Sequence, residues 1–455
     1  MKYQLAVIGG GPGGYTAAEF AAKKGLSVVL FEADKIGGTC LNRGCIPTKA
    51  LIHSAGMFKE FKNSEYLGIE SADISYSFEK MHGRKDAVVA ALRSGIEKTL
   101  KSAKVTVVNA FAAVTEYSDS GVIIRAADGL YEAEKLIIAT GSVPAVPPIP
   151  GCDCEGVFTS DAVLEGCGKK LDSLIIIGGG VIGCECASIY LDLGCKVTII
   201  EAMEHILPPM DKEIAQRLTM VLKKRGAQIN TTAKVTKTEN NNNLLTVTYE
   251  DKKGAVCTAE AEGVLIATGR KAFTEGLFEC ENKPEFQRSA VCANEDGLTA
   301  DKAIYVIGDA KAGNIQLAHV AEAQGKNAVC AILGEKPFVD MSVVPSCIYT
   351  SPEIASVGLT EDEAKAKGFA VKTKKALTGA NGKCLIENSE SGYIKTVTDE
   401  ESGRLLGAQL VCPRATDMVS EFAVALSNGL KTSEIASVIH PHPTFSEMIA
   451  AACGE

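Results

Sequence analysis

The sequence lacks tryptophan altogether, aromatic residues make up only 5% of it, and it contains no long hydrophobic or basic run. The shortage of aromatic residues carries no functional meaning by itself. Because no run of about 18 apolar residues without charges is present, we expect no membrane-spanning helix. The missing basic run and the net charge of −9 argue against a surface that binds nucleic acid or anionic membranes. We therefore expect small molecules or other proteins as partners.

The chain also lacks the features of an exported protein held together by disulfides. The segment before the apolar residues 5–8 is too short for a signal peptide, so we expect a cytoplasmic protein. The 16 cysteines are then expected to be mostly reduced thiols. Two Cys-x-Cys pairs occur, at 152–154 and 184–186, but neither has a second pair nearby at zinc-ligand spacing. We expect no metal site.

With 455 residues, of which 46% are hydrophobic, the chain is long enough for about three globular domains. Near its start the buried-strand pattern Leu5–Ile8 runs into Gly9-x-Gly11-x-x-Gly14, and the next apolar segment ends at Glu32. In a strand-turn-helix unit, such glycines let the backbone approach a pyrophosphate, and the acid accepts hydrogen bonds from an adenosine ribose. A single fingerprint of this kind is a weak signal, because glycine-rich turns are common.

The same unit is repeated in the middle of the chain. Gly178, Gly180 and Gly183 follow the apolar segment Leu174–Ile177, and Glu201 stands at the same distance from the first glycine as in the first unit. Both units also end alike. An apolar strand is followed by Ile-Ala-Thr-Gly in each, at residues 138–141 and 266–269. The duplication turns a weak signal into a strong one and predicts two bound dinucleotides.

A pair of cysteines, Cys40 and Cys45, follows the first fingerprint closely. A disulfide closing so short a loop would stabilise the fold by only about 2 kcal/mol, so its purpose is better explained by opening and closing. The pattern around Cys45, Pro47 and Lys49 predicts the first turn of a helix, where backbone N–H groups and the lysine stabilise a thiolate. From spacing alone, two ordinary buried thiols remain the alternative.

The segment that contains this pair, Gly37-Gly-Thr-Cys-Leu-Asn-Arg-Gly-Cys-Ile-Pro-Thr-Lys49, resembles the redox-active segment of the flavoprotein disulfide reductases. Within that family it is most similar to the enzymes that oxidise dihydrolipoyl groups. Glutathione and mercuric reductases share the Cys-x4-Cys spacing but usually carry valine where Leu41 and Ile46 stand. The resemblance covers essentially the whole chain.

The resemblance implies an α/β fold with two Rossmann-like dinucleotide-binding domains and a C-terminal α+β dimerisation domain. The FAD-binding domain would comprise residues 1–145 and 271–340, with the NAD-binding domain, residues 146–270, inserted between them. Residues 341–455 would form the dimer-interface domain. Their alternating strand and helix patterns without a glycine fingerprint agree with that assignment.

The family's cofactors are FAD at the first site and a pyridine nucleotide at the second. We expect NAD, because NADP enzymes need a cation for the 2′-phosphate and the residues after Glu201 supply none. The resemblance also implies that Lys49 lies at the flavin and pairs with Glu185, where it would stabilise negative charge on the reduced ring. The cofactor-binding residues that it implies are Gly9, Gly11, Gly14, Glu32, Thr39, Lys49, Ala112, Thr140, Gly141, Gly178, Gly180, Gly183, Glu201, Val235, Gly269, Asp309 and Ala318.

The segment from His440 to Glu447, near the C-terminus, carries histidines suited to act as a general base toward a dithiol at neutral pH. These histidines could instead belong to a metal site, and Thr444-x-x-Glu447 is a capping box in which the glutamate begins a helix. The resemblance implies that His442 is the base and that Glu447 orients it. In a two-fold symmetric homodimer this base would serve Cys40 of the partner subunit.

The catalytic residues implied in this way are Cys40, Cys45, Lys49, Glu185, His442 and Glu447. Together they predict an enzyme that oxidises protein-bound dihydrolipoyl groups through a Cys40–Cys45 disulfide and FAD and reduces NAD to NADH. The expected partners are a second copy of the chain and a lipoyl-domain protein of a 2-oxo acid dehydrogenase or glycine cleavage system. The alternatives are another disulfide reductase of the family or a mainly structural subunit of a multienzyme complex.

Overall fold

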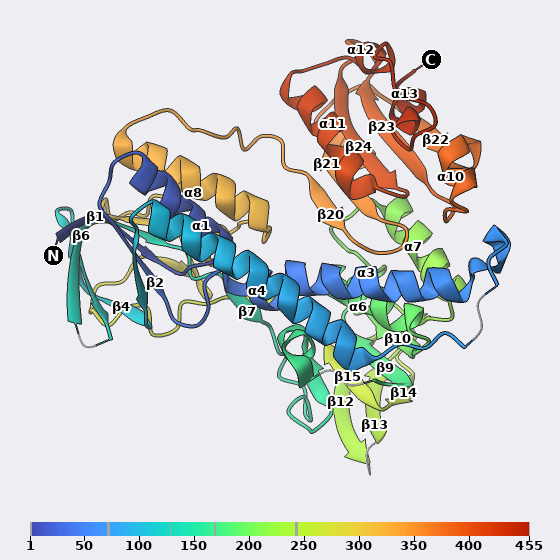
Figure 1. The fold of residues 1–455 in the computed structure, drawn as a ribbon, viewed down its shortest axis with the longest axis horizontal. Helices are drawn as coiled ribbons and strands as arrows, with labels where there is room; N and C mark the ends of the chain where they lie inside the picture. Colours follow the sequence, from blue (N-terminus) through green and yellow to red (C-terminus); the bar gives the residue numbers. More distant parts are fainter. Residues whose placement is uncertain (1, 71–72, 128, 168–169, 242–243, 455) are drawn as a thin grey trace.

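The computed structural model describes residues 2–70, 73–127, 129–167, 170–241 and 244–454. The chain folds into three units that follow its colours in Figure 1: a blue-to-cyan unit completed by yellow and orange segments, a green-to-yellow unit, and a red unit at the C-terminus. No helix among the described residues is long and apolar enough to cross a membrane.

A parallel sheet forms the centre of the first unit. Its parallel strands, in the order in which they lie side by side, are β3 (Thr106–Asn109), β2 (Val28–Glu32), β1 (Lys2–Ile8), β6 (Gly129–Ile138) and β19 (Ile304–Val306). Residues 5–7 of β1 are fully buried, as expected of a central parallel strand covered on both faces. The helices α1 (Pro12–Lys23) and α8 (Ala318–Leu333) pack on each other beside this sheet, although they are far apart in the sequence (Figure 1).

A pair of antiparallel strands and a pair of long helices complete the first unit. The strands β4 (Ala112–Ser118) and β5 (Gly121–Ala126) form an antiparallel meander with β6. The long helices α3 (Cys45–Lys62) and α4 (Phe78–Ser102) pack on each other and run toward the second unit (Figure 1), where α3 contacts α6 (Val181–Asp192). The helix that begins at Cys45 therefore lies between the two units.

The second unit repeats the parallel sheet. Its strands, in spatial order, are β11 (Gln228–Asn230), β10 (Lys196–Ile200), β9 (Ser173–Ile177), β15 (Gly263–Ile266) and β8 (Val157–Thr159). An antiparallel meander follows the helix α7 (Lys212–Lys224) and consists of β12 (Lys234–Asn241), β13 (Leu244–Glu250) and β14 (Val256–Ala261). The chain leaves the first unit through β7 (Ser142–Pro144) and returns through β16 (Arg270–Ala272), and these two short strands pair with each other.

The C-terminal unit has a different architecture, with one antiparallel sheet and short helices. Its strands, in spatial order, are β20 (Ser346–Ile348), β21 (Ile354–Gly358), β24 (Leu405–Val411), β23 (Tyr393–Asp399) and β22 (Val371–Leu377). Its helices are α9 (Glu361–Ala366), α10 (Gly382–Ile386), α11 (Ala415–Ser427), α12 (Thr432–Ala436) and α13 (Glu447–Cys453). Two parallel α/β units and one α+β unit confirm the predicted fold class.

The glycine turns have the same construction in both parallel units. Gly9 and Gly178 have φ angles of +104° and +106°, which L side chains rarely adopt. A Cβ atom at Gly14 would lie 1.8 Å from the Gly9 carbonyl oxygen, and one at Gly183 would lie 2.1 Å from that of Gly178. These third glycines therefore allow the helix to pack directly against the turn that precedes it.

The third glycine of the second unit provides a test of this packing. Replacing Gly183 with alanine should push α6 away from the turn and cost about 1–3 kcal/mol, the usual price of overpacking a tight core. Thermal unfolding of the two proteins side by side measures the effect as a lower midpoint. Gly83→Ala is the matched control, because Gly83 is exposed within α4 and no atom lies within 4 Å of an added Cβ there. Equal midpoints for Gly183→Ala and Gly83→Ala would contradict the packing argument.

Candidate active site

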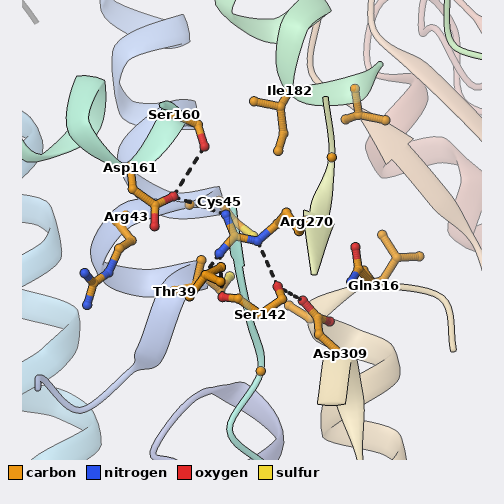
Figure 2. A pocket seen from close by; sticks show the side chains of 18 of the residues that line it. Thr39, Arg43, Cys45, Ser142, Ser160, Asp161, Ile182, Arg270, Asp309 and Gln316 are labelled. Atoms are coloured by element: carbon orange, nitrogen blue, oxygen red, sulfur yellow. Dashed lines mark hydrogen bonds and ion pairs between the residues drawn. The ribbon is translucent and has the colours of Figure 1, made fainter. Parts of the chain in front are cut away.

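One large cavity, of about 1680 Å³, lies where the two parallel units and the first strand of the C-terminal unit meet. Figure 2 shows part of its lining, with Cys45, Thr39 and Asp309 from the first unit and Ile182 from the second. The predicted site residues that line this cavity are Gly9, Gly11, Glu32, Thr39, Cys40, Cys45, Lys49, Ala112, Thr140, Gly141, Gly178, Gly180, Glu185, Glu201, Val235, Gly269, Asp309 and Ala318. The fold thus brings most of the predicted site together.

Four predicted residues lie elsewhere. Gly14 and Gly183 are behind the turns, where they contact Gly9 and Gly178. His442 and Glu447 belong to the C-terminal unit and do not line the cavity of their own chain. Within a single chain, His442 and Glu447 are therefore separate from the cysteine pair.

Two equivalent cradles face this cavity, one from each glycine turn. No side chain caps the N-terminus of α1 at Gly11 or of α6 at Gly180, so the first N–H groups of both helices are free to bind a phosphate. An added Cβ at Gly180 would meet nothing within 4 Å, which leaves open space in front of that turn. The uncapped helix ends and the cavity volume fit two dinucleotides.

The acid at the end of the second strand is held in the same way in each unit. Glu32 accepts hydrogen bonds from the N–H groups of Gly10 (2.7 Å) and Asp34 (2.9 Å). Glu201 accepts them from Gly179 (2.6 Å) and Met203 (2.7 Å). A carboxylate oxygen can accept more than one hydrogen bond, so each acid keeps acceptor capacity for the hydroxyls of a ribose.

Cys40 and Cys45 face each other across a sharp turn between two helices. Cys40 lies in α2 (Gly38–Arg43), and Cys45 is the first residue of α3, after the N-cap Gly44. No disulfide joins the two cysteines in this structure. The predicted helix start at Cys45 is confirmed.

The surroundings shift the pKa values of the two thiols in opposite directions. A hydrogen bond from Cys40, the charge of Lys49 and the N–H at the helix start lower the pKa of Cys45 to about 7, against opposing effects of burial and Glu185. The same thiol–thiol hydrogen bond, together with burial, raises the pKa of Cys40 far above its ordinary value. Of the two thiols, Cys45 is therefore the one that ionises first.

Lys49 and Glu185 form an ion pair across the boundary between the two parallel units. The Lys49 ammonium donates to both oxygens of Glu185 at 2.9 Å, and the Glu185 side chain is only 4% exposed. Burial opposes the charge on Lys49, but Glu185 more than offsets it and raises the pKa of the ammonium. The ammonium of Lys49 therefore stays charged at neutral pH, one helical turn from Cys45.

Asp309, which follows β19, also lines the cavity. Ser142 donates a hydrogen bond of 2.5 Å to its carboxylate. Burial raises the pKa of Asp309, while Ser142 and the nearby Arg270 lower it. The side chain is well placed to receive hydroxyl groups of a ligand that extends along this wall (Figure 2).

Glu447 contacts both the ring of His442 and the backbone of Thr444. Its Oε1 atom lies 2.9 Å from Nδ1 of His442, and its Oε2 atom accepts the N–H of Thr444 at 2.9 Å. The Thr444 N–H and His442 lower the pKa of Glu447. The side chain of His442 is 79% exposed, so its other ring nitrogen is available to a group outside this chain.

Comparisons with known proteins agree with this geometry. Residues 3–325 match the family described as pyridine nucleotide-disulphide oxidoreductase, and residues 344–453 match the dimerisation domain of the same family. The chain belongs to this family. Its membership confirms the predicted class of enzyme and its cofactors, FAD and NAD, and the matched dimerisation domain supports a homodimer.

Several curated relatives of this oxidoreductase are named dihydrolipoyl dehydrogenase. One from Bacillus subtilis is 39% identical, and the alignment covers 99% of this chain and 97% of the relative. One from Mycoplasma pneumoniae is 36% identical over 100% and 98%. Solved structures also match: LpdA from Mycobacterium tuberculosis has a TM-score of 0.90 at 27% identity, covering 99% of each chain. The HOCl-induced flavoprotein disulfide reductase RclA from Escherichia coli has a TM-score of 0.87 at 28% identity, again covering 99% of each.

Arg270 also lines the cavity of this oxidoreductase, and the sequence analysis missed it. Its guanidinium pairs with Asp161 (3.1 Å) and donates to the Ser142 side chain (2.8 Å) and to the Ser142 carbonyl (2.7 Å), as Figure 2 shows. Arg270 follows the second Ile-Ala-Thr-Gly segment, whereas Ser142 follows the first. This difference between two otherwise equal segments was the signal that could have revealed it.

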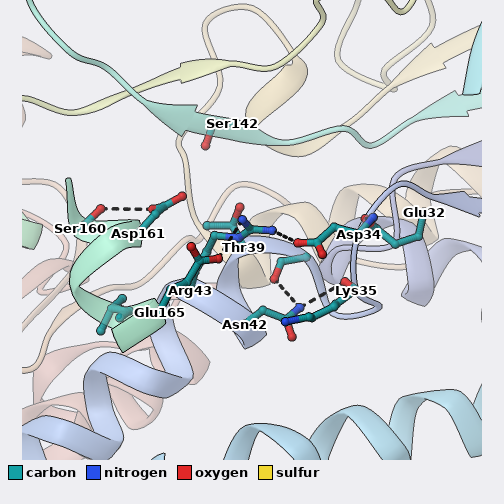
Figure 3. Close-up of polar contacts among 12 residues, drawn as sticks. Glu32, Asp34, Lys35, Thr39, Asn42, Arg43, Ser142, Ser160, Asp161 and Glu165 are labelled. Atoms are coloured by element: carbon teal, nitrogen blue, oxygen red, sulfur yellow. Dashed lines mark hydrogen bonds and ion pairs between the residues drawn. The ribbon is translucent and has the colours of Figure 1, made fainter. Parts of the chain in front are cut away.

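A second missed arginine lies between the two cysteines. Arg43 pairs with Asp34 of the first unit and donates to Glu165 of the second unit at 3.0 Å, as seen in Figure 3. Glu165 and Asp161 are four residues apart in one short helical segment. Arg43 and Arg270 thus hold that segment of the second unit against the redox-active loop.

The acidic thiol gives a prediction for the reduced enzyme. The rate at which iodoacetamide alkylates Cys45 should rise with pH and reach half its maximum near pH 7, because the thiolate is populated only above the pKa. Peptide mass spectrometry after timed quenching measures each cysteine separately. The fully buried Cys184, whose pKa is raised by burial, is the internal control and should stay unmodified in the folded protein. Faster alkylation of Cys40 than of Cys45 at pH 7 would contradict the charge assignment.

Proposed function

We propose that this chain is a dihydrolipoyl dehydrogenase, which oxidises dihydrolipoyl groups carried by a partner protein and reduces NAD. The observation that supports this most is the position of the Cys40–Cys45 pair, inside one cavity with two dinucleotide cradles. The names of the curated relatives support the choice of dihydrolipoyl groups as substrate. The lipoyl group would arrive on a lipoyl-domain protein of a 2-oxo acid dehydrogenase or glycine cleavage system.

The chemistry begins from the oxidised pair. A dihydrolipoyl thiolate attacks Sγ of Cys40, the Cys40–Cys45 bond breaks, and Cys45 leaves as a thiolate. The second lipoyl thiol then attacks the mixed disulfide, which forms the cyclic lipoyl disulfide and releases Cys40 as a thiol. The low pKa of Cys45 makes it the better leaving group, because a more acidic thiol leaves faster. Bound FAD and NAD would supply the remaining chemistry, as acceptors of the two electrons of the Cys40–Cys45 dithiol.

The proposed cofactor contacts follow the two cradles. FAD would lie on Gly9, Gly11 and Glu32, with Asp309 on its ribityl chain, in a domain formed by residues 1–145 and 271–340. NAD would lie on Gly178, Gly180 and Glu201, in the inserted domain 146–270. The carboxylate of Glu201 favours a free ribose hydroxyl and repels a 2′-phosphate, which supports NAD over NADP.

The proposed base is His442 of the partner subunit, acting on the dithiol that attacks Cys40. Its exposed ring and its hydrogen bond to Glu447 support this role, because the carboxylate orients the ring toward a group outside its own chain. Residues 341–455 would then serve two purposes, as dimer interface and as donor of the base.

A turnover assay tests the function directly. The purified FAD-loaded enzyme should oxidise dihydrolipoamide with NAD and show little activity with glutathione disulfide plus NADPH. A preference for the second pair would assign the chain to another branch of the family. Activity with neither pair, in a protein that retains FAD, would support a mainly structural subunit instead.

Complementation between subunits tests the shared site. His442→Gln should slow dithiol oxidation by about 10²–10⁴, the usual contribution of a positioned base, while reduction of bound flavin by NADH stays largely intact. Cys45→Ser should abolish turnover but keep FAD bound. In a heterodimer of the two variants, half the sites combine an intact cysteine pair with an intact histidine.

Exchanging subunits between these two inactive parents should therefore restore part of the activity. Tagging each variant differently and purifying through both tags isolates the heterodimer. A heterodimer as inactive as both parents would show that His442 does not act across the interface.

A further inference from the structure

All three units meet at the Lys49–Glu185 pair. Lys49 comes from α3 of the first unit, Glu185 from α6 of the second, and Tyr349 follows β20 of the C-terminal unit. The N–H of Tyr349 donates to Oε1 of Glu185 at 3.0 Å, and the Lys49 ammonium lies 4.6 Å from the centroid of the Tyr349 ring. The aromatic face and the carboxylate thus bind the same ammonium group.

The backbone on both sides of Tyr349 is held by contacts that do not involve Lys49. Two residues further on, the carbonyl of Ser351 accepts a hydrogen bond from Arg225 of the second unit at 3.3 Å. Arg225 is itself held by Asp192 at the end of α6. On the other side, Ile348 pairs with Ile354 in the C-terminal sheet. The tyrosine therefore presents its ring from a segment that is anchored on both sides.

Lys49 needs such support because its side chain is long and flexible. The same ammonium pairs with Glu185 of the second unit and interacts with the thiolate of Cys45, one turn away in its own helix. A ring face attracts a cation without competing for it as a base, since it carries no net charge. Burial raises the pKa of Tyr349, so the phenol stays neutral at working pH.

We propose that Tyr349 is a positioning residue whose ring keeps the Lys49 ammonium where it stabilises the Cys45 thiolate. Through this contact the C-terminal unit, which carries the dimerisation domain, acts on the redox pair of its own chain. The proposal rests on the proposed function insofar as that thiolate is the species which the enzyme uses. It adds to that function a residue outside both dinucleotide cradles.

Other charged and titratable groups lie near Cys45 and Lys49 and could also affect how the reactivity of Cys45 changes with pH. Around Cys45 and Lys49 these groups are Cys40, Glu185, Cys186, Cys347, Tyr349 and Glu353. Cys186 and Cys347 have pKa values raised by burial and therefore stay neutral where Cys45 titrates. Glu185 is not altered in the experiment, so its effect is common to all variants.

The test follows the alkylation of Cys45 in the reduced, FAD-loaded protein as a function of pH. Tyr349→Leu removes the ring and should lower the alkylation rate at pH 7 by about threefold, the size expected for one partly exposed cation–π contact. The profile should move to higher pH by a corresponding amount. Tyr349→Phe, which keeps the ring, is the matched control and should match the unmodified protein. Should the leucine variant lose FAD, Tyr349→Met repeats the test with a flexible side chain.

A double-mutant cycle with Lys49 separates positioning from general damage. Lys49→Met alone should also move the Cys45 profile to higher pH, since it removes the stabilising charge. In the Lys49→Met background, Tyr349→Leu should change nothing further, because the ring no longer has a cation to hold. Equal shifts in both backgrounds, a phenylalanine variant that behaves like leucine, or an unchanged profile in Tyr349→Leu would each overturn the proposal.

This readout uses neither dihydrolipoamide nor NAD. Failure of the turnover assay would therefore reject the proposed substrate without touching the role of Tyr349. Failure of the alkylation cycle would reject that role and leave the proposed function standing.

Discussion

The ion pair between Lys49 and Glu185 is the constraint on which the arrangement of the three units depends. Taking a carboxylate that is 4% exposed out of water costs several kcal/mol unless a cation replaces the lost solvation. The cation comes from the first unit and the carboxylate from the second, so neither unit can bury its charge alone. The backbone of Tyr349 completes the shell of Glu185 from the third unit. The same ion pair therefore holds the units together and acts on the charge of the redox pair.

The two parallel units have equivalent dinucleotide cradles and differ where this constraint applies. Their glycine turns, uncapped helix ends and ribose acids have the same geometry, down to the two backbone N–H groups that bind each acid. The position equivalent to Glu185 in the first unit is Thr16, which carries no charge. Likewise, Arg270 stands where the first unit has Ser142, and only the arginine reaches across to its counterpart segment. The differences lie at the boundary between the units, and the similarities lie in the dinucleotide cradles.

Much of the site was predictable from the sequence because its signals are local. The glycine spacing defines a turn that only glycine can make, and the acid at the end of the next strand is a fixed number of residues away. The start of α3 at Cys45 followed in the same way, since Pro47 and Lys49 are typical of a first helical turn. Arg270 had only a weak signal, its difference from Ser142 at the matching position, and Arg43 and Tyr349 had none. The contacts that these three residues make between units join positions more than a hundred apart, which no local pattern specifies.

The sequence by itself determined the two cradles, the cysteine pair and the class of fold, because each depends on backbone geometry over a few consecutive residues. Only the tertiary structure decided which thiol carries the charge. That charge depends on the distances from Cys45 to Cys40, Lys49 and Glu185, and the last of these lies on a different unit of the fold. The tertiary structure also decided that His442 stands apart from the cavity of its own chain with an exposed ring. Electrostatic interactions act through space, and spacing along the chain does not specify them.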